Sequence, residues 1–510
     1  MCRICFFFLF SLILACSSLP AHVNKTPSSA LLPDSQSRIG QELDRRHLVH
    51  SDKSAFRPLL SGQDALLARL TSAVAADHSL DLQYYIWSND MTGLLIMKSI
   101  LDAADRGVRV RLLLDDLNLA KFGKNLTILS SHPHIEVRMV NPFTNRESQW
   151  KDVFRFSQVN HRMHNKVFIA DNLLGIVGGR NLADEYFDAS EEYNFGDFDL
   201  WASGPVVSDL SKEFDLYWNS DLAYPVQSLH PDVHPTPEDF NRLRQKLEQN
   251  FRDAQQSEYG ETLRQTLNGS ILSGRSPDIF WGKAVVLMDS PEKLDEEKTK
   301  NNINLRDQLT DQIQNLHKEL FLISPYFIPQ EEGLNFFKEL SEKGVTTTVL
   351  TNSLASSDVA TVFSGYKSTR KALLKNGVHL YETKAKPAQH RPKIKTLGSS
   401  LSRSGLHGKV FIFDSEKVFV GSMNLDPRSI HLNSEMGVLV ESPEMAQRMT
   451  QHLISRLPDL AYQLRLEEDQ LRWLSLDHGE KFEYDTEPET SWWQRFKAGA
   501  MAIFIPQSQL

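Results

Sequence analysis

The sequence has little cysteine, no excess of positive charge and no apolar run long enough to cross a membrane as a helix. Only three of 510 residues are cysteines, and all of them, Cys2, Cys5 and Cys16, lie near the start. The rest of the chain therefore has no thiol for a disulfide, a zinc site or nucleophilic catalysis. The formal net charge of −9 argues against a dedicated nucleic-acid binder, because such proteins neutralise phosphates with excess lysine and arginine.

The composition is otherwise that of a globular protein, with 41% hydrophobic and 24% charged residues. A chain of 510 residues is too long for one compact core, so we expect two domains. The predicted organisation is, in order, a signal or lipobox-like segment (1–16), a polar tether (17–56), a first domain (57–225), a linker and helix (226–275), a second domain (276–475) and a C-terminal tail (476–510).

The N-terminus predicts export. Its apolar run from Ile4 to Ala15 is shorter than the roughly 20 residues that span a bilayer and has the length of a secretory h-region. The run ends in ILAC, which resembles a lipobox whose cysteine, Cys16, is lipidated. We therefore expect a lipoprotein anchored on the periplasmic side, in preference to a plain cleaved signal or a short anchor. Ser17 favours the outer membrane, but the choice between the two membranes stays open.

Both predicted domains follow one plan of alternating helices and strands. In the first, ARLTSAVAADHSLDLQYYIW predicts a helix followed by a strand, and GLLIMKSILDAADRGVRVRLLLDD predicts a helix, a glycine stop and a buried strand. In the second, DQLTDQIQNLHKELFLISPYFI and GLNFFKELSEKGVTTTVLTNS repeat that order. Gly107 and Gly344 fall at corresponding helix ends, and Tyr85 and Tyr326 at corresponding strand ends. We therefore expect an α/β sandwich in each half.

Two segments each allow two interpretations. Between residues 367 and 409, eleven lysines and arginines stand against one acidic residue, which indicates a solvated basic loop or a surface for anionic head groups. The C-terminal segment SWWQRFKAGAMAIFIPQSQL places Trp492, Trp493 and Phe496 beside two cationic residues. It predicts a helix docked on the second domain, which we favour, or an interfacial membrane segment.

Two motifs with the same spacing of polar residues lie 243 residues apart, HNKVFIADNLLGIVGGRN and HGKVFIFDSEKVFVGSMN. In both, the histidine is followed by Lys at +2, Asp at +7, Gly at +14 and Asn at +17. One such H-x-K-x-x-x-x-D pattern arises by chance in roughly one chain in twenty of this length, but two copies at identical offsets inside an internal repeat do not. The polar residues of the two copies are His164, Lys166, Asp171, Asn181, His407, Lys409, Asp414 and Asn424.

The spacing of each motif indicates an anion site. A histidine and a lysine two residues apart in a strand face the same side, whereas the aspartate at +7 faces the other side and is expected to support the geometry of the site. Lys166 and Lys409 disfavour a metal cation, and His161 has no suitable co-ligand, so we expect no metal and no other cofactor. The two lysines and the amides of Asn181 and Asn424 can instead bind the oxygens of one phosphodiester.

Two histidines in one such site indicate a division of labour. One attacks phosphorus to give a phosphohistidine, and the other protonates the leaving alcohol and then deprotonates the incoming one. The nucleophile must be neutral and oriented, which requires a carboxylate on its other ring nitrogen. Candidates are Asp197, 33 residues after His164, and Glu435, 28 residues after His407.

At these motifs the chain resembles the phospholipase D superfamily, whose signature is a duplicated H-x-K-x-x-x-x-D followed by G-[GS]-x-N. The resemblance covers about residues 60 to 475 and is strongest to bacterial cardiolipin synthases of the C type, in stretches such as LDLQYYIWSNDMTG, HRMHNK, SGYKSTRKALLKNGVHLYE and GSMNLDPRS. It implies two phospholipase D-like α/β sandwich domains related by a pseudo-twofold axis, with one shared site and no metal requirement. It also implies catalytic roles for the eight motif residues, with His164 favoured as the nucleophile.

The function that this resemblance implies is phosphatidyl transfer. We expect a phosphatidyl group to be joined to phosphatidylglycerol at a membrane surface, with phosphatidylethanolamine as a donor. One alternative is a phospholipase D that hydrolyses phospholipids to phosphatidic acid with the same residues. A nucleic-acid phosphodiesterase is disfavoured by the net charge and the export signal, and a non-catalytic lipid-binding lipoprotein by two intact motifs.

Overall fold

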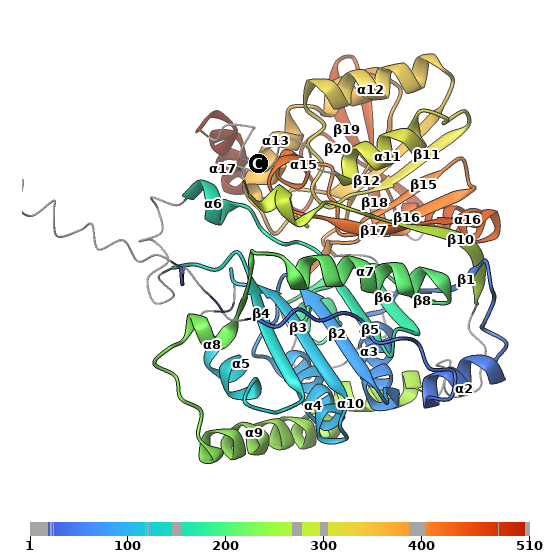
Figure 1. Ribbon diagram of the computed structural model, residues 1–510. Helices are drawn as coiled ribbons and strands as arrows, with labels where there is room; N and C mark the ends of the chain where they lie inside the picture. The colour runs from blue at the N-terminus through green and yellow to red at the C-terminus, as the bar shows by residue number, and fades with distance from the viewer. Residues whose placement is uncertain are drawn as a thin grey trace, which may run out of the picture.

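The chain folds into two α/β halves, which lie one above the other in Figure 1. The computed structural model describes residues 19, 20, 23, 25–117, 119, 122–144, 156–267, 278–295, 304–386, 403–477 and 479–504. The expected class, two phospholipase D-like α/β sandwich domains, is confirmed. The lipobox-like segment with Cys16 lies outside the described residues.

The first half has a mixed sheet in the order β9-β4-β3-β2-β5-β6-β8-β1, in which β2, β3 and β4 are parallel. Its strands are β1 (Ser54–Leu59), β2 (Ser79–Tyr84), β3 (Arg109–Asp115), β4 (Ile135–Val140), β5 (Val167–Ala170), β6 (Leu174–Gly178), β7 (Tyr193–Gly196), β8 (Asp199–Ser203) and β9 (Ala223–Pro225). Its helices are α2 (Arg38–Arg45), α3 (Gly62–Ala75), α4 (Met91–Asp105), α5 (Gly123–Leu129), α6 (Phe156–Asn160), α7 (Pro205–Asn219), α8 (Val226–Leu229), α9 (Pro237–Gln256) and α10 (Glu258–Leu267).

The second half repeats this arrangement in the order β10-β17-β16-β15-β11-β12-β13-β18-β19-β20. Its strands are β10 (Phe280–Met288), β11 (Glu319–Ile323), β12 (Thr346–Asn352), β13 (His379–Thr383), β14 (Arg403–Leu406), β15 (Val410–Phe413), β16 (Lys417–Gly421), β17 (Met436–Glu441), β18 (Ala461–Glu467), β19 (Gln470–Asp477) and β20 (Glu480–Tyr484). Its helices are α11 (Leu305–Ile313), α12 (Gln330–Glu342), α13 (Ala360–Lys367), α14 (Arg370–Lys375), α15 (Pro427–His431), α16 (Pro443–Leu460) and α17 (Trp492–Phe504).

The predicted helix ends are confirmed in both halves. Gly107 follows α4 with φ +94°, and Gly344 follows α12 with φ +79°. Only glycine adopts this left-handed conformation without steric cost, and it lets the chain leave the helix and enter the next parallel strand. The same turn therefore gives β3 and β12 corresponding positions in the two sheets, each parallel to the preceding strand.

Each motif aspartate lies in a hairpin turn, between β5 and β6 or between β15 and β16. Asp171 and Asp414 both have φ above +50°, a region that Asp tolerates better than most residues. The Asp171 carboxylate accepts hydrogen bonds of 2.8 to 2.9 Å from the backbone N–H groups of residues 77, 78 and 79, just before β2. The Asp414 carboxylate does the same before β11, at 2.9 and 3.0 Å from the N–H groups of residues 318 and 319. Both aspartates thus fix a central strand from the end remote from the histidines.

The two halves share one continuous apolar core. Buried residues of the first half, such as Val177 and Phe214, belong to the same cluster as Val420, Val438 and Met445 of the second. Strand β1 also pairs antiparallel with β10, which joins the edges of the two sheets. The interface is therefore built like a protein interior, and it holds the halves in one arrangement.

The segment expected as a polar tether is bound to the first half over most of its length. Residues 25–34, called the strap here, cross the face of that half, and α2 and β1 follow them (Figure 1). Buried or partly buried arginines donate to the strap's backbone, with 2.7 Å from Arg138 to the Thr26 oxygen and 3.0 Å from Arg111 to the Ser28 oxygen. Polar groups hold this segment, namely its backbone oxygens and a few polar side chains such as Lys25, which explains why its composition is polar.

The regions expected as linker and tail are also folded. Helix α9 begins with a capping box between Thr236 and Asp239 and packs on α4 and α5 of the first half. Beyond residue 475, β20 extends the second sheet, and α17 packs on α13 with Ala498 fully buried. A docked C-terminal helix is therefore present, as we favoured.

Candidate active site

Reciprocal strand contacts bring the two motifs together. Just before β5, the His164 N–H donates to the Ser434 oxygen of the second half over 2.9 Å. Just before β15, the His407 N–H donates to the Gly196 oxygen of the first half over 2.8 Å, and β14 pairs in parallel with β7. The two histidine N–H contacts thus run in opposite directions between the halves, as a pseudo-twofold relation predicts.

The carboxylates pair with the histidines across the two halves. The His164 Nδ1 lies 2.8 Å from Glu435 Oε2, and the His407 Nδ1 lies 2.6 Å from Asp197 Oδ2. Both predicted carboxylates are therefore in contact with a histidine, but each with the one from the other motif. The sequence left open which carboxylate serves which histidine, and the structure shows a crossed pairing because the segments that carry the carboxylates cross the interface.

The two carboxylates differ in their other contacts. Glu435 accepts hydrogen bonds from the hydroxyls of Ser422 and Ser429. At the position of Ser422 the first motif has Gly179, and a Cβ atom there would lie 2.2 Å from Asp197 Oδ1. The second position of GGRN and GSMN, Gly179 in one motif and Ser422 in the other, therefore suits the carboxylate that lies against it.

Both histidines are held neutral at neutral pH. Burial lowers the pKa of His164 well below its usual 6.5, and the charges of Lys166 and Lys409 lower it further. Burial and Lys409 lower the pKa of His407 to about 4, against the opposing effect of Asp197. Because each Nδ1 faces a carboxylate, the proton sits on Nδ1, and Nε2 carries the lone pair that a nucleophile or base needs.

The two motif lysines are buried and converge from opposite halves. Each Nζ donates to the backbone oxygen of its own histidine, and the Lys409 Nζ lies 3.2 Å from His407 Nε2. Burial lowers the pKa of Lys409 to about 8 and that of Lys166 well below 10.5, and the charge of Lys409 lowers the Lys166 value further. A bound anion would reverse this shift, because an opposite charge favours the protonated amine. Binding of a phosphate therefore favours the protonated, positively charged form of both lysines.

The motif asparagines are buried at the ends of β6 and β16. The Asn181 Oδ1 accepts from the Ile86 N–H at 3.2 Å, which turns its amide NH₂ group away from that strand. The Asn424 Oδ1 has no hydrogen-bond partner among the residues that the structure describes. Buried amides with spare hydrogen-bonding capacity are suited to a polar ligand.

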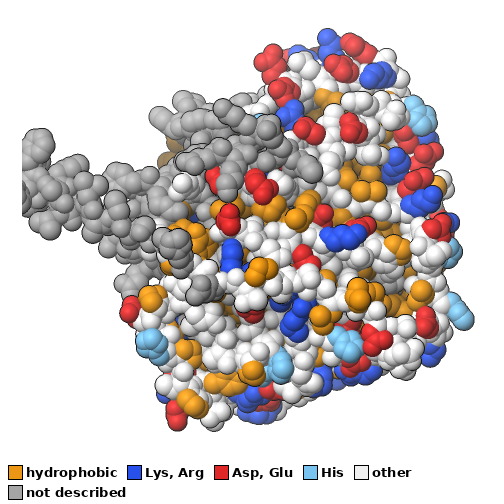
Figure 2. Space-filling model, in the orientation of Figure 1, with side chains coloured by type: hydrophobic (Ala, Val, Ile, Leu, Met, Phe, Trp, Pro, Cys, Tyr) orange, Lys and Arg blue, Asp and Glu red, His pale blue; other side chains and the backbone are white. Residues whose placement is uncertain are grey.

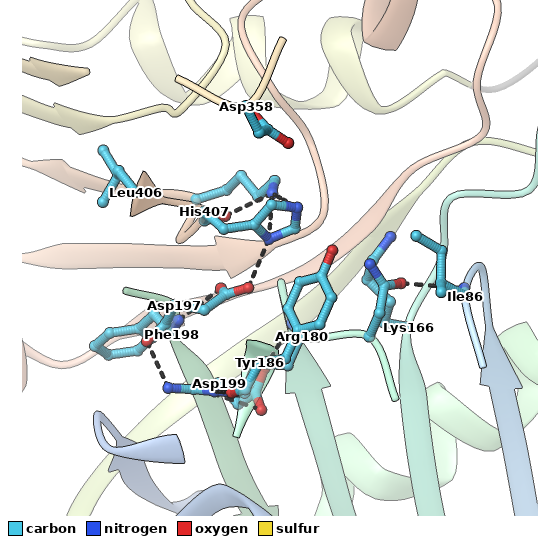
Figure 3. A network of polar contacts seen from close by, with 12 residues as sticks. Ile86, Lys166, Arg180, Tyr186, Asp197, Phe198, Asp199, Asp358, Leu406 and His407 are labelled. Carbon is cyan, nitrogen blue, oxygen red and sulfur yellow. Dashed lines mark hydrogen bonds and ion pairs between the residues drawn. The ribbon is translucent and has the colours of Figure 1, made fainter. Parts of the chain in front are cut away.

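The surroundings of the two histidines have opposite charge. Figure 3 shows His407 between Asp197 and the exposed Asp358, whose carboxylate accepts from the Tyr326 hydroxyl at 2.9 Å. On the His164 side, Arg428 lowers the histidine pKa and donates to Asn160 of α6. One side of the site is therefore acidic and the other is basic.

Aromatic rings flank both histidines. The Tyr85 ring meets His164 edge-on at 4.9 Å between centroids, and the Tyr186 ring meets His407 at 5.0 Å. Such contacts restrict the rotation of each imidazole and exclude water from it. Among the described residues, no group of three or more His, Cys, Asp or Glu side chains is placed to hold a metal ion.

Comparison with known proteins gives the family. A family profile described as "Cardiolipin synthase, PLD-like domain" matches residues 66–218 and 309–457, one segment in each half. The chain belongs to the cardiolipin synthase family of phospholipase D-like enzymes.

Relatives in this family cover nearly the whole chain. Cardiolipin synthase C of Escherichia coli (strain K12) is 39% identical over 88% of this chain and 94% of its own length. An uncharacterized protein of Helicobacter pylori (strain ATCC 700392 / 26695) is 31% identical over 90% of each chain. The crystal structure of phosphatidylserine synthase from Haemophilus influenzae Rd KW20 matches with a TM-score of 0.54 at 14% identity, over 92% of this chain and 96% of that one. This last likeness shows the fold.

Several contacts of this cardiolipin synthase family site were absent from the sequence reasoning. The sequence showed Tyr85 and Tyr326 only as corresponding strand ends. That correspondence was the one sequence signal that both tyrosines lie near the active site. Arg428 and Asp358 carry no such signal, because no corresponding residue for either of them was found in the sequence of the other half. Ser422 lies inside the GSMN motif, but its hydrogen bond to Glu435 depends on the fold.

Proposed function

We propose that this enzyme transfers a phosphatidyl group to phosphatidylglycerol and so forms cardiolipin. The observation that carries the proposal is the crossed pairing of His164 with Glu435 and His407 with Asp197, which makes two motifs into one site with two neutral histidines. The identity of 39% to a cardiolipin synthase over 88% of the chain supports the choice of substrates.

The first step forms a phosphohistidine. The Nε2 atom of His164 attacks phosphorus of the donor lipid, and the bond from phosphorus to the head-group oxygen breaks. His407 gives a proton to the leaving oxygen, and the anionic phosphodiester bound between the lysines raises the pKa of His407 towards the range in which it carries that proton. Lys166 and Lys409 stabilise the charge that develops on the phosphoryl oxygens.

The second step resolves the intermediate. His407, now neutral, takes the proton from a hydroxyl of the phosphatidylglycerol head group. The resulting oxygen nucleophile attacks phosphorus, and the bond to the His164 Nε2 breaks. Cardiolipin leaves, and both histidines return to their starting protonation states.

The acidic side of the site supports phosphatidylethanolamine as a donor. The exposed carboxylate of Asp358 lies beside His407, where the departing head group must sit if His407 protonates it. A carboxylate at this place attracts an ammonium group. We expect Asp358→Asn to raise KM for phosphatidylethanolamine and to leave KM for phosphatidylglycerol as donor nearly unchanged.

Transfer and hydrolysis use the same residues and are separated by the product. Purified enzyme given vesicles of phosphatidylglycerol and phosphatidylethanolamine, with a chelator present, should form cardiolipin by mass spectrometry. Phosphatidic acid as the sole product would replace this proposal with a phospholipase D. On the face drawn in Figure 2, acidic and basic side chains of the described residues are interspersed, and the net charge of −9 further disfavours nucleic acid as a substrate.

We also propose that Cys16 is lipidated and holds the enzyme on the periplasmic side of a membrane. The lipobox-like ILAC sequence supports this anchor, and no helix among the described residues is long and apolar enough to cross a bilayer. Cys16→Ser should remove the lipid from the chain, as read by mass spectrometry, whereas Cys5→Ser should change nothing in the mature protein.

A further inference from the structure

The C-terminal helix α17 carries an exposed aromatic cluster, defined as Trp492, Trp493 and Phe496. Their exposed fractions are 60%, 63% and 54%. The three rings contact one another, with centroids 4.8, 5.3 and 5.9 Å apart. Large aromatic side chains gathered on a surface mark an interaction site, because leaving them in water is costly.

The helix that presents this cluster is fixed to the fold. Ala498 is fully buried, and α17 packs on α13. At its start, the Ser491 N–H donates to Gln494 and the Gln494 N–H donates back to the Ser491 hydroxyl, which caps the helix. Arg495 donates to the Thr490 oxygen at 2.9 Å. The aromatic cluster thus has a fixed direction relative to the second half.

The exposed Asp358, which lies next to His407, is on the same side of the molecule as this helix. Helix α13, on which α17 packs, begins two residues after the exposed Asp358. Helix α15, which carries Arg428, is bonded to α6 of the first half through Asn160. Figure 1 shows α6, α13, α15 and α17 together on the left of the molecule. The aromatic cluster and the exposed Asp358 beside His407 therefore lie on one side of the molecule.

The strap enters the fold from this side as well. Lys25 donates to the backbone oxygens of Ser220 and Ala223, and Ala223 pairs with Val140 at the carboxyl end of β4. In Figure 1 the strap runs from the left across the first half to α2. Lys25 is only nine positions after Cys16, a reach of roughly 30 Å when fully extended. A lipid on Cys16 would keep this side close to its bilayer.

The charge beside the aromatic cluster suits a lipid surface. Lys497 is exposed on α17, and the exposed Lys386 lines a small hollow together with Gln494, Ala385 and one acidic residue, Glu489. The wider basic stretch contributes less than its sequence suggested, because ion pairs neutralise part of it, including Lys371 and Lys375 with Asp469. Aromatic rings with flanking lysines are the composition of an interfacial helix.

We propose that the aromatic cluster of α17 docks on the lipid bilayer and sets the active site against the phospholipid head groups. The helix has 13 residues, about 20 Å, and is too short to span a bilayer core, so it lies on the surface. The proposal rests on the proposed function in that the substrates are phospholipids. The proposal combines the two interpretations of the C-terminal segment. The buried side of α17 packs on the protein, and its exposed side contacts lipid.

Fluorescence quenching tests the docking in the full-length chain. Vesicles of phosphatidylethanolamine and phosphatidylglycerol with brominated acyl chains should quench the enzyme's tryptophan emission. Trp492→Phe/Trp493→Phe keeps two aromatic rings and should bind equally well, but should lose most of the quenching. Equal quenching of wild type and variant would overturn the proposal, because the remaining tryptophans would then be the ones in contact with lipid.

A binding measurement supplies the matched control. In a Cys16→Ser background, Trp492→Ser/Trp493→Ser/Phe496→Ser should weaken sedimentation with the same vesicles roughly 100-fold. Val285→Ser/Ile454→Ser changes residues that are 57% and 52% exposed on β10 and α16, at the right of Figure 1, and should bind as the background does. Equal binding of the triple variant, with an unchanged unfolding midpoint, would refute the proposal. Neither measurement needs turnover, so failure of phosphatidyl transfer would leave this result intact.

Discussion

Each histidine of the site receives its tautomer and orientation from a carboxylate of the other half. Asp197→Asn and Glu435→Gln keep the shape of the side chain but lose the charge that holds Nδ1–H. We expect each variant to lower kcat roughly 10³-fold and to change KM little, because the histidine acts mainly in the transition state. Steady-state kinetics on mixed vesicles measures this.

The double variant distinguishes one site from two. If both pairs serve one reaction, Asp197→Asn/Glu435→Gln should be little slower than either single variant, because residues that act as a unit are not additive. Losses that multiply would indicate two independent sites. Asp209→Asn, which changes an exposed carboxylate on α7, is the control and should keep full activity.

The pKa of Lys409 predicts the alkaline limit of activity. Burial lowers this pKa to about 8 in the free enzyme, so the lysine loses its proton, and with it the attraction for phosphate, as pH rises past that value. We expect kcat/KM to fall above about pH 8. Bound substrate is anionic and raises the pKa of Lys409 again. The alkaline limb of the kcat profile should therefore lie at higher pH than that of kcat/KM. A kcat limb at lower pH than the kcat/KM limb would contradict the account.

At the scale of secondary structure elements, the two hairpin aspartates hold the central strands. Asp171→Ala removes three hydrogen bonds from a side chain that is 1% exposed. The loss should be about 3 kcal/mol of the free energy of unfolding, which lowers the unfolding midpoint by roughly 3 °C if both halves unfold together. Asp414→Ala should have a smaller effect, since its side chain is 9% exposed and its bonds are longer.

Calorimetry and specific activity together decide the role of these aspartates. Asp171→Asn retains an acceptor oxygen and should recover part of the midpoint. The folded fraction of each variant should remain active, because neither carboxylate contacts His164 or His407 in the structure. Complete loss of activity with an unchanged midpoint would mean that Asp171 takes part in the chemistry.

At the scale of the whole molecule, the fold could be predicted from the sequence because the signals that define each repeat are short-range. Helix, glycine stop and strand recur in both halves at Gly107 and Gly344, and each signal depends on residues close in sequence. The motif residues were found for the same reason. Which carboxylate meets which histidine depends instead on how the halves cross, and spacing along the chain carries no information on that.

The boundaries of the two halves were less predictable. The strap looked like a tether because its side chains are polar, yet it is held by arginines that donate to its backbone. The end of the second half was set too early, since β20 and α17 continue it. Contacts of this kind leave no hydrophobic pattern in the sequence.

The central claim is that one site, made by both halves, carries the phosphatidyl group on His164 while His407 moves the proton. The direct test uses His407→Ala with a phosphatidyl nitrophenol, whose leaving group needs no proton, followed by an alkaline quench and peptide mass spectrometry. The account predicts that a phosphatidyl group accumulates on His164, because the second step lacks its base, and that His164→Ala forms no adduct. An adduct on His407 in the His164→Ala variant, or none on His164, would contradict it.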